Sequence, residues 1–185
     1  RKTGCTTLMV THDQAEALTI ADNVLLMHQG KIVQEGSPVE LYRYPNTLFS
    51  ADFIGTNNFL KGTVTAINRN TTVTLDGTAT TLAAEQVLPG VTIGAPVWVC
   101  ARADDIDIID ADQAARYPNV VEAKVEQALL TGGTVIVQAR VGETELRIHA
   151  GGSKRFQLLG QEGKSIFCSL GNISLIARGA DEGKR

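Results

Sequence analysis

Short β-like segments separated by turn-forming residues fill the chain from Phe59 onward. Each segment is rich in β-branched and apolar residues, and Gly, Asn and Asp recur between them. The segments are residues 61–67, 72–75, 97–101, 121–129, 134–141, 145–148, 165–170 and 174–177. This spacing predicts a mostly β fold built on small barrels for about two thirds of the chain.

A weak internal repeat lies within this β-rich region. The stretch GAPVWVC at residues 94–100 resembles GKSIFC at 163–168, and each is followed by a turn and a short apolar run. Two similar units of this size predict either a pair of small barrels or one intertwined barrel. Residues 110–118 lie between the units and are expected to form an exposed connection.

The first 55 residues have a different pattern, typical of alternating strands and helices. Residues 6–10 (TTLMV) are β-branched and apolar, which predicts a strand buried on both faces of a parallel sheet. A helix is expected to follow from about residue 13 to 21, with acidic Asp13 and Glu16 in its first turn. Residues 24–27 and 31–34 then predict a β-hairpin, with Gly30 supplying a positive φ in the turn.

Two short helices are predicted after the hairpin. Ser37 is a suitable N-cap, Pro38 fits the first helical position and Glu40 completes a capping box. Pro45 ends this helix. Asn46 is expected to cap a second helix that ends at Gly55.

Composition excludes several classes of protein. The chain is 43% hydrophobic and 20% charged, and no apolar run approaches the roughly 18 residues of a membrane span. A net charge of −3 argues against nucleic acid as a partner. The three scattered cysteines predict reduced, mostly buried thiols, with neither a disulfide framework nor a zinc site. Without an initial Met or a signal sequence, the chain is expected to be a piece of a longer cytosolic protein.

His12 is the strongest candidate for a functional residue. It stands at the end of a predicted buried strand and just before a helix, where a side chain can reach a ligand above the sheet. Packing against the following helix is the alternative interpretation. His28 and His149 have no Cys, His or carboxylate at ligand spacing, so no metal site is predicted there.

The residues around His12 resemble a known family. Residues 8–17 (LMVTHDQAEA), Ala21-Asp22 and residues 27–36 (MHQGKIVQEG) are similar to the switch region of ABC ATPases. Pro38, residues 42–45 (YRYP) and residues 53–58 (FIGTNN) are similar to the importer branch in particular. That branch includes the ATPases for maltose, glycerol-3-phosphate, polyamine, ferric iron and phosphonate uptake.

The resemblance implies a domain organisation. Residues 1–55 are expected to be the C-terminal end of an ABC ATPase domain, following a P-loop ATPase core. Residues 56–185 are expected to form the transport-associated OB-like (TOBE) regulatory domain, in two similar halves at about 56–110 and 119–178. Within the family's Arg-Pro-Glu element this chain has Arg102-Ala103-Asp104. The loss of Pro puts the role of a rigid turn in doubt, while Arg102 keeps the ability to pair with an acidic neighbour.

The resemblance also implies a function, which is regulation and dimerisation of the subunit whose ATP hydrolysis drives solute import. His12 would contact the γ-phosphate of ATP, with ATP and Mg as cofactors of the complete protein. The expected partners are a second copy of the chain, transmembrane permease subunits and a substrate-binding protein. The subunit itself is expected at the cytoplasmic face of the inner membrane. An alternative is a small-molecule or oxyanion sensor on the same barrels, for which Lys154 and Arg155 are the available loop cations.

The chain is not expected to hydrolyse ATP alone. The printed sequence contains no phosphate loop of the G-x-x-x-x-G-K-[ST] type, no Leu-Ser-Gly-Gly-Gln signature and no acidic strand for magnesium. We expect no cofactor and no metal on this chain by itself. Asp104, Asp105, Asp107, Asp110 and Asp112 lack the Gly and Glu of a calcium loop and are interpreted as a solvated strand face. Trp98 and Phe167 are predicted to pack in the core.

Overall fold

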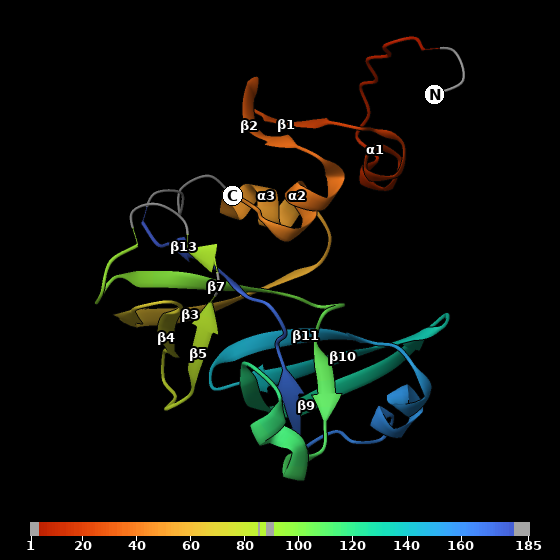
Figure 1. Cartoon of the computed structure of the whole chain (residues 1–185). Helices are drawn as coiled ribbons and strands as arrows, with labels where there is room; N and C mark the ends of the chain where they lie inside the picture. The colour runs from red at the N-terminus through yellow and green to blue at the C-terminus, as the bar shows by residue number, and fades with distance from the viewer. Residues whose placement is uncertain (1–3, 85, 88–90, 180–185) are drawn as a thin grey trace.

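The computed structural model describes residues 4–84, 86–87 and 91–179, arranged as an N-terminal group of short elements beside a β-rich body (Figure 1). The N-terminal elements are α1 (Gln14–Ile20), β1 (Val24–His28), β2 (Lys31–Gly36), α2 (Pro38–Arg43) and α3 (Leu48–Phe53). The first strands of the body are β3 (Asn57–Ile67), β4 (Thr71–Leu75), β5 (Thr81–Ala84), β6 (Gln86–Val87), β7 (Pro96–Arg102) and β8 (Asp107–Ile109). After the 3₁₀ helix η1 (Ala111–Arg116) come β9 (Val120–Thr131), β10 (Thr134–Val141), β11 (Thr144–Ala150), η2 (Ser153–Leu158), β12 (Ser165–Ser169) and β13 (Ser174–Ala177).

The predicted strand at residues 6–10 is wrong. These residues have no regular structure, and Leu8 and Val10 are 83% and 92% exposed. A strand of a parallel sheet depends on neighbours at its edges and helices on its faces. The described residues supply no partner strand for this segment. Its apolar, β-branched composition therefore produces no strand here.

The predicted hairpin and helix caps are confirmed, with one correction. Gln29 and Gly30 both have positive φ, at 49° and 75°, as expected for a tight two-residue hairpin turn. The capping box of α2 is complete, because the Ser37 hydroxyl accepts from the Glu40 amide and the Glu40 carboxylate accepts from the Ser37 amide. The cap of α3 is Thr47, one residue after the predicted Asn46.

The β-rich body consists of two curved sheets that exchange strands. One sheet has the order β5-β4-β3-β7-β13-β6 and the other has the order β11-β10-β9-β12-β8. Strand β8 follows β7 in sequence but pairs with β12 in the second sheet. Strand β13 follows β12 but pairs with β7 in the first sheet. The body is mostly β, as predicted, and the strands of its two sheets are intertwined.

Equivalent hydrogen bonds recur in the two sheets. Val64 of β3 accepts from the Gly94 amide at 2.8 Å and donates to the Ala95 carbonyl at 3.0 Å. In the second sheet, Val125 of β9 accepts from Gly163 at 2.8 Å and donates to Lys164 at 2.9 Å. Each of these valines is followed by an irregularity in the pairing of its strand with the next one. The sequence repeat therefore corresponds to repeated backbone geometry.

Both sheets contribute to one hydrophobic core. Leu60 and Val73 of the first sheet belong to the same buried cluster as Val137 and Ile148 of the second sheet. Burying apolar surface stabilises the fold by roughly 25 cal/mol per Å². A shared core therefore holds the two sheets together as one body. Within the described residues, no helix is long and apolar enough to cross a lipid bilayer.

Candidate functional site

Arg102 joins the N-terminal helices to the β-rich body. It is the last residue of β7 and only 6% exposed. Its guanidinium donates from Nη1 to the Ile54 carbonyl at 2.7 Å and from Nη2 to the Tyr42 carbonyl. The guanidinium carbon also lies 3.6 Å from the centre of the Tyr42 ring. One side chain of the body thus binds the ends of both α2 and α3.

The charges around Arg102 belong to the same arrangement. The Tyr42 hydroxyl donates to the Asp104 carboxylate. Burial lowers the pKa of Arg102, and the neighbouring Asp104 and Asp105 partly oppose this effect. Burial, together with the bond to Asp104, raises the pKa of Tyr42 to about 12. We call Tyr42, Ile54, Gly55, Arg102 and Asp104 the Arg102 joint.

Gly55 leaves room for the guanidinium. Its φ is +75°, a conformation that residues with a side chain rarely adopt. A Cβ added at this position would lie 2.6 Å from Arg102 Nη1, which is closer than a real contact allows. The glycine predicted to end α3 therefore also permits the joint to close.

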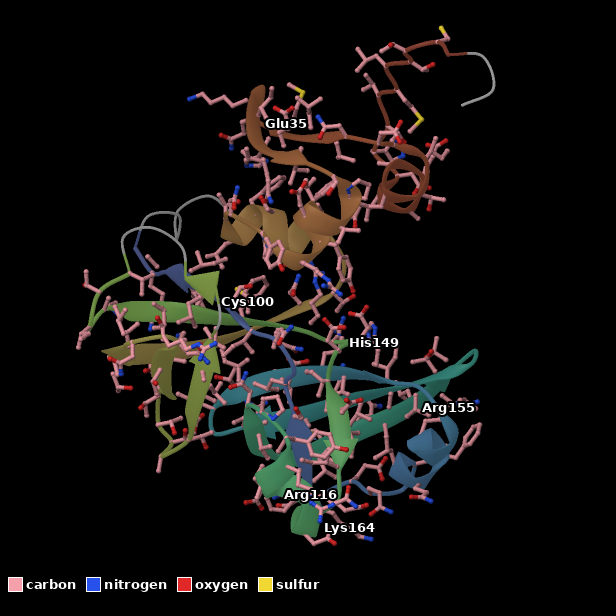
Figure 2. The ribbon with its side chains drawn as sticks, viewed as in Figure 1. Glu35, Cys100, Arg116, His149, Arg155 and Lys164 are labelled. Carbon is pink, nitrogen blue, oxygen red and sulfur yellow. The ribbon has the colours of Figure 1, made fainter. Side chains whose placement is uncertain are left out.

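Helix α3 packs on the body as well as on the other helices. Leu48 and Ala51 share a buried cluster with Cys100 of β7 and Ile176 of β13. Figure 2 shows Cys100 beneath the helices. Asn57, at the start of β3, donates to the carbonyls of Ala51 and Ile54. These contacts bridge the boundary predicted at residue 55.

The structure places His12 apart from the joint. It is exposed, on the segment that leads into α1, where Asp13 is the N-cap. The Asp13 carboxylate accepts from the Glu16 amide at 3.0 Å, and the Asp13 amide donates to Thr11 at 3.0 Å. These bonds fix the entry to α1 and leave the imidazole of His12 at the surface. The contact of His12 with ATP remains a prediction.

The other candidate residues are distributed over the molecule. The ring of His28 lies 4.0 Å from the Phe49 ring, and His149 lies on the side of β11 that faces the helices (Figure 2). Among the described residues, no group of three or more His, Cys, Asp or Glu side chains could hold a metal ion. The buried thiols of Cys100 and Cys168 are free, as predicted, while Cys5 is exposed.

Trp98 and Phe167 lie at corresponding places in β7 and β12. Both side chains are only partly buried, so the prediction that they pack in the core is confirmed only in part. Trp98 packs against the α3 cluster, and Lys61 and Arg178 lie 5.8 Å and 5.2 Å from its ring centre. It also lines a groove of about 650 Å³ between the sheets, together with Asn58, Asp76, Glu145 and Arg147. The groove carries charges of both signs, so its lining favours no single class of ligand.

Arg102 was expected to be able to pair with an acidic neighbour. In the structure its guanidinium donates to two backbone carbonyls, and the nearby Asp104 and Asp105 act on it electrostatically. The roles of Tyr42 and Asn58 were not predicted. A signal for Asn58 was present, because two consecutive asparagines are unusual inside a long strand.

Comparisons with known proteins give relatives over parts of the chain. A spermidine/putrescine import ATP-binding protein of Bacteroides thetaiotaomicron is 37% identical over 136 residues, which is 70% of this chain and 28% of that protein. An Fe(3+) ions import ATP-binding protein of Rhizobium meliloti is 59% identical over 64 residues, covering 35% of this chain and 16% of that protein. A sulfate/thiosulfate import ATP-binding protein of Chromobacterium violaceum is 55% identical over 60 residues, covering 32% of this chain and 16% of that protein. The chain thus spans less than a third of each of these relatives, and no family model matches it.

A solved structure gives a likeness of fold. The cytoplasmic molybdate-binding protein ModG, with molybdate bound, matches 64% of this chain and 94% of its own length, with a TM-score of 0.50 and 20% sequence identity. At this identity the match supports the fold alone.

Proposed function

We propose that this chain, which is homologous to the ATP-binding subunits of ABC importers, forms the regulatory and dimerisation part of such a subunit. Its partners would be a second copy, permease subunits that cross the membrane and a substrate-binding protein. The names of the relatives refer to spermidine/putrescine, Fe(3+) and sulfate/thiosulfate import. Because they differ, we assign no solute to this chain.

The Arg102 joint is the observation that carries this proposal. A regulatory body can influence an ATPase domain only if the two are mechanically connected. Arg102 binds α2 and α3 through their carbonyls, and α3 shares an apolar cluster with β7 and β13. Movement of these helices would therefore be passed to the β-rich body.

His12 is the residue through which the chain would contribute to ATP hydrolysis. Phosphoryl transfer is catalysed chiefly by positioning and by electrostatic stabilisation. The exposed imidazole of His12 can donate a hydrogen bond to a γ-phosphate oxygen, a charge-assisted contact of about 1.5–3 kcal/mol. Mg and the remaining phosphate contacts would come from parts of the subunit that this sequence lacks.

ATP hydrolysis by the complete subunit tests this role. We expect His12→Ala to lower the rate by roughly tenfold to a hundredfold, the loss of one charge-assisted contact in the transition state. His149→Ala, which changes a histidine in β11, serves as the matched control and should leave the rate near its original value. A folded His12→Ala subunit with an unchanged rate would remove His12 from the proposal.

Dimerisation is tested on the chain itself. Homo-oligomers most often have two-fold symmetry, and sheet edges offer surfaces for such contacts. We expect light scattering to give twice the 19.7 kDa mass of the chain. A stable monomer at high concentration would contradict dimerisation through this part.

Oxyanion sensing is the second candidate, favoured by the fold shared with ModG. A surface groove lined by Lys124 and Arg140 has cations suited to an anion. However, Arg140 already pairs with Glu126 through Nε at 2.7 Å, which reduces the positive charge available there. Calorimetric titration with molybdate, sulfate and phosphate tests this function, and saturable heat with any of them would favour it over the first candidate.

A further inference from the structure

Asn58 closes the free edge of the second sheet with its side chain. Its amide nitrogen donates to the Arg147 carbonyl at 2.8 Å, and its amide oxygen accepts from the Arg147 N–H at 2.7 Å. The same nitrogen also donates to the Ala101 carbonyl at 3.3 Å. One buried side chain, 5% exposed, thus connects β3, β7 and β11. We call these contacts the Asn58 bridge.

Asn119 makes the corresponding contacts at the first sheet. Its amide nitrogen donates to the Ala83 carbonyl at 3.1 Å, and its oxygen accepts from the Ala83 N–H at 2.7 Å. The nitrogen also donates to the Gly171 carbonyl at 2.9 Å. Asn119 directly precedes β9, as Asn58 lies at the start of β3. The two asparagines are therefore equivalent members of the internal repeat.

The surroundings of the two bridges differ. Asn58 follows Asn57, which donates to α3, and it bonds to the residue that precedes Arg102. Beside it, the Ala103 amide donates to Thr56 at 3.0 Å, and the Ala103 carbonyl accepts from His149 of β11 at 2.8 Å. Asn119 follows Pro118, whose carbonyl accepts from Ser169 of β12, and its own side chain contacts Ala83 of β5 and Gly171. Only the Asn58 bridge, among these two, adjoins the Arg102 joint.

We propose that Asn58 is a positioning residue that couples the Arg102 joint to strand β11 of the second sheet. The coupling rests on the contacts of this chain, and its use in regulation rests on the proposed function. A shift of α3 or of the end of β7 displaces Asn58, and Asn58 holds both backbone groups of Arg147. Glu145 and Arg147 line the groove between the sheets, so the same displacement would reshape that groove.

Amide hydrogen exchange of the whole 185-residue chain tests the coupling. Asn58→Ala should speed exchange of the Arg147 amide by about tenfold or more, because this amide loses its acceptor, and should leave Ala83 unchanged. Asn119→Ala is the matched control, which should speed exchange of the Ala83 amide and leave that of the Arg147 amide unchanged. Arg102→Lys, which retains the charge but loses the planar fork, should speed Arg147 exchange in the wild-type and Asn119→Ala chains. In the Asn58→Ala chain, Arg102→Lys should change the exchange rate of the Arg147 amide by less than about twofold.

Two results would overturn the proposal. The first is that Arg102→Lys, made in the wild-type chain, leaves the exchange rate of the Arg147 amide unchanged. The second is that Arg102→Lys changes this rate equally in the wild-type and the Asn58→Ala chains. If Asn58→Ala fails to fold, Asn58→Leu, which is close to Asn in size and also removes the acceptor of the Arg147 amide, replaces it in the comparison. Because no nucleotide or transporter is present in this experiment, failure here leaves the proposed regulatory function untouched, and the loss of that function leaves the coupling intact.

Discussion

At the scale of single residues, backbone carbonyls accept the hydrogen bonds of a buried arginine. The ends of α2 and α3 leave carbonyl groups without helical partners, and Arg102 donates to one in each of these segments. The aromatic face of Tyr42 adds a cation–π contact. A planar guanidinium suits this geometry better than an ammonium group, because its donors are fixed in a fork.

Arg102→Ala is expected to lower the free energy of unfolding by about 2–4 kcal/mol, since it leaves buried carbonyls unpaired. Urea unfolding of the chain measures the change. Arg140→Ala removes an exposed ion pair with Glu126 and should lower the free energy of unfolding far less. Equal losses for the two variants would show that the joint is no more important than a surface pair.

Tyr42 is expected to ionise late among the three tyrosines of the chain. Its pKa is raised to about 12, so the neutral hydroxyl is favoured in the folded state. The contribution of this neutral hydroxyl to the free energy of unfolding is present below the ordinary tyrosine pKa of 10, and it is lost as pH rises through about 12. Ultraviolet titration should show a late phenol transition that Tyr42→Phe removes, whereas its persistence in that variant would contradict the assignment.

At the scale of elements, α3 belongs to both parts of the molecule. Its sequence position places it with the N-terminal helices, and its buried residues Leu48 and Ala51 contact β7 and β13. The strands it covers contain Cys100, whose pKa burial raises to about 12. Burial has the same effect on Cys168 in β12.

Thiol labelling therefore reports on the packing of β7 and β12. At about pH 8, a thiol with a pKa of about 12 is ionised to only about one part in 10⁴. We expect iodoacetamide to modify the exposed Cys5 in the native chain and all three cysteines after denaturation. Intact mass measures the labels. Rapid native labelling of Cys100 or Cys168 would show that these strands open readily.

Local signals predicted the elements well where the determinants are local. The Ser37–Glu40 capping box and the Gln29-Gly30 turn depend on adjacent residues, and both occur as predicted. The strand at residues 6–10 depends on neighbouring strands, and the described residues supply none. The exchange of β8 and β13 likewise depends on pairing between residues about 60 to 80 positions apart, which periodicity does not contain.

The candidate site was predictable only in part for the same reason. Arg102 was identified through a resemblance, but its carbonyl partners come from residues 48 and 60 positions away. Asn58 reaches Arg147 across 89 positions. Such contacts follow from topology, and an asparagine in a strand does not by itself indicate which backbone it will bind.

At the scale of the whole molecule, two similar units form one body by exchanging their last strands. The shared core and the two asparagine bridges hold the sheets together. One end of this body carries the Arg102 joint, whereas Arg116 and Lys164 lie at the opposite end (Figure 2). In the proposed function, this asymmetry of an otherwise repeated fold lets one end serve as the connection to an ATPase domain.

Solute imported per ATP hydrolysed is the measurement that tests this account most directly. For the proposed function, the experiment uses the complete subunit in vesicles with the proposed permease and substrate-binding protein, as wild type, Arg102→Lys and the matched control Arg140→Lys. If the joint couples the two parts by about 1 kcal/mol or more, Arg102→Lys should lower this ratio by about fivefold or more, and Arg140→Lys should not. A folded Arg102→Lys subunit that imports as much solute per ATP as the wild type would contradict the account.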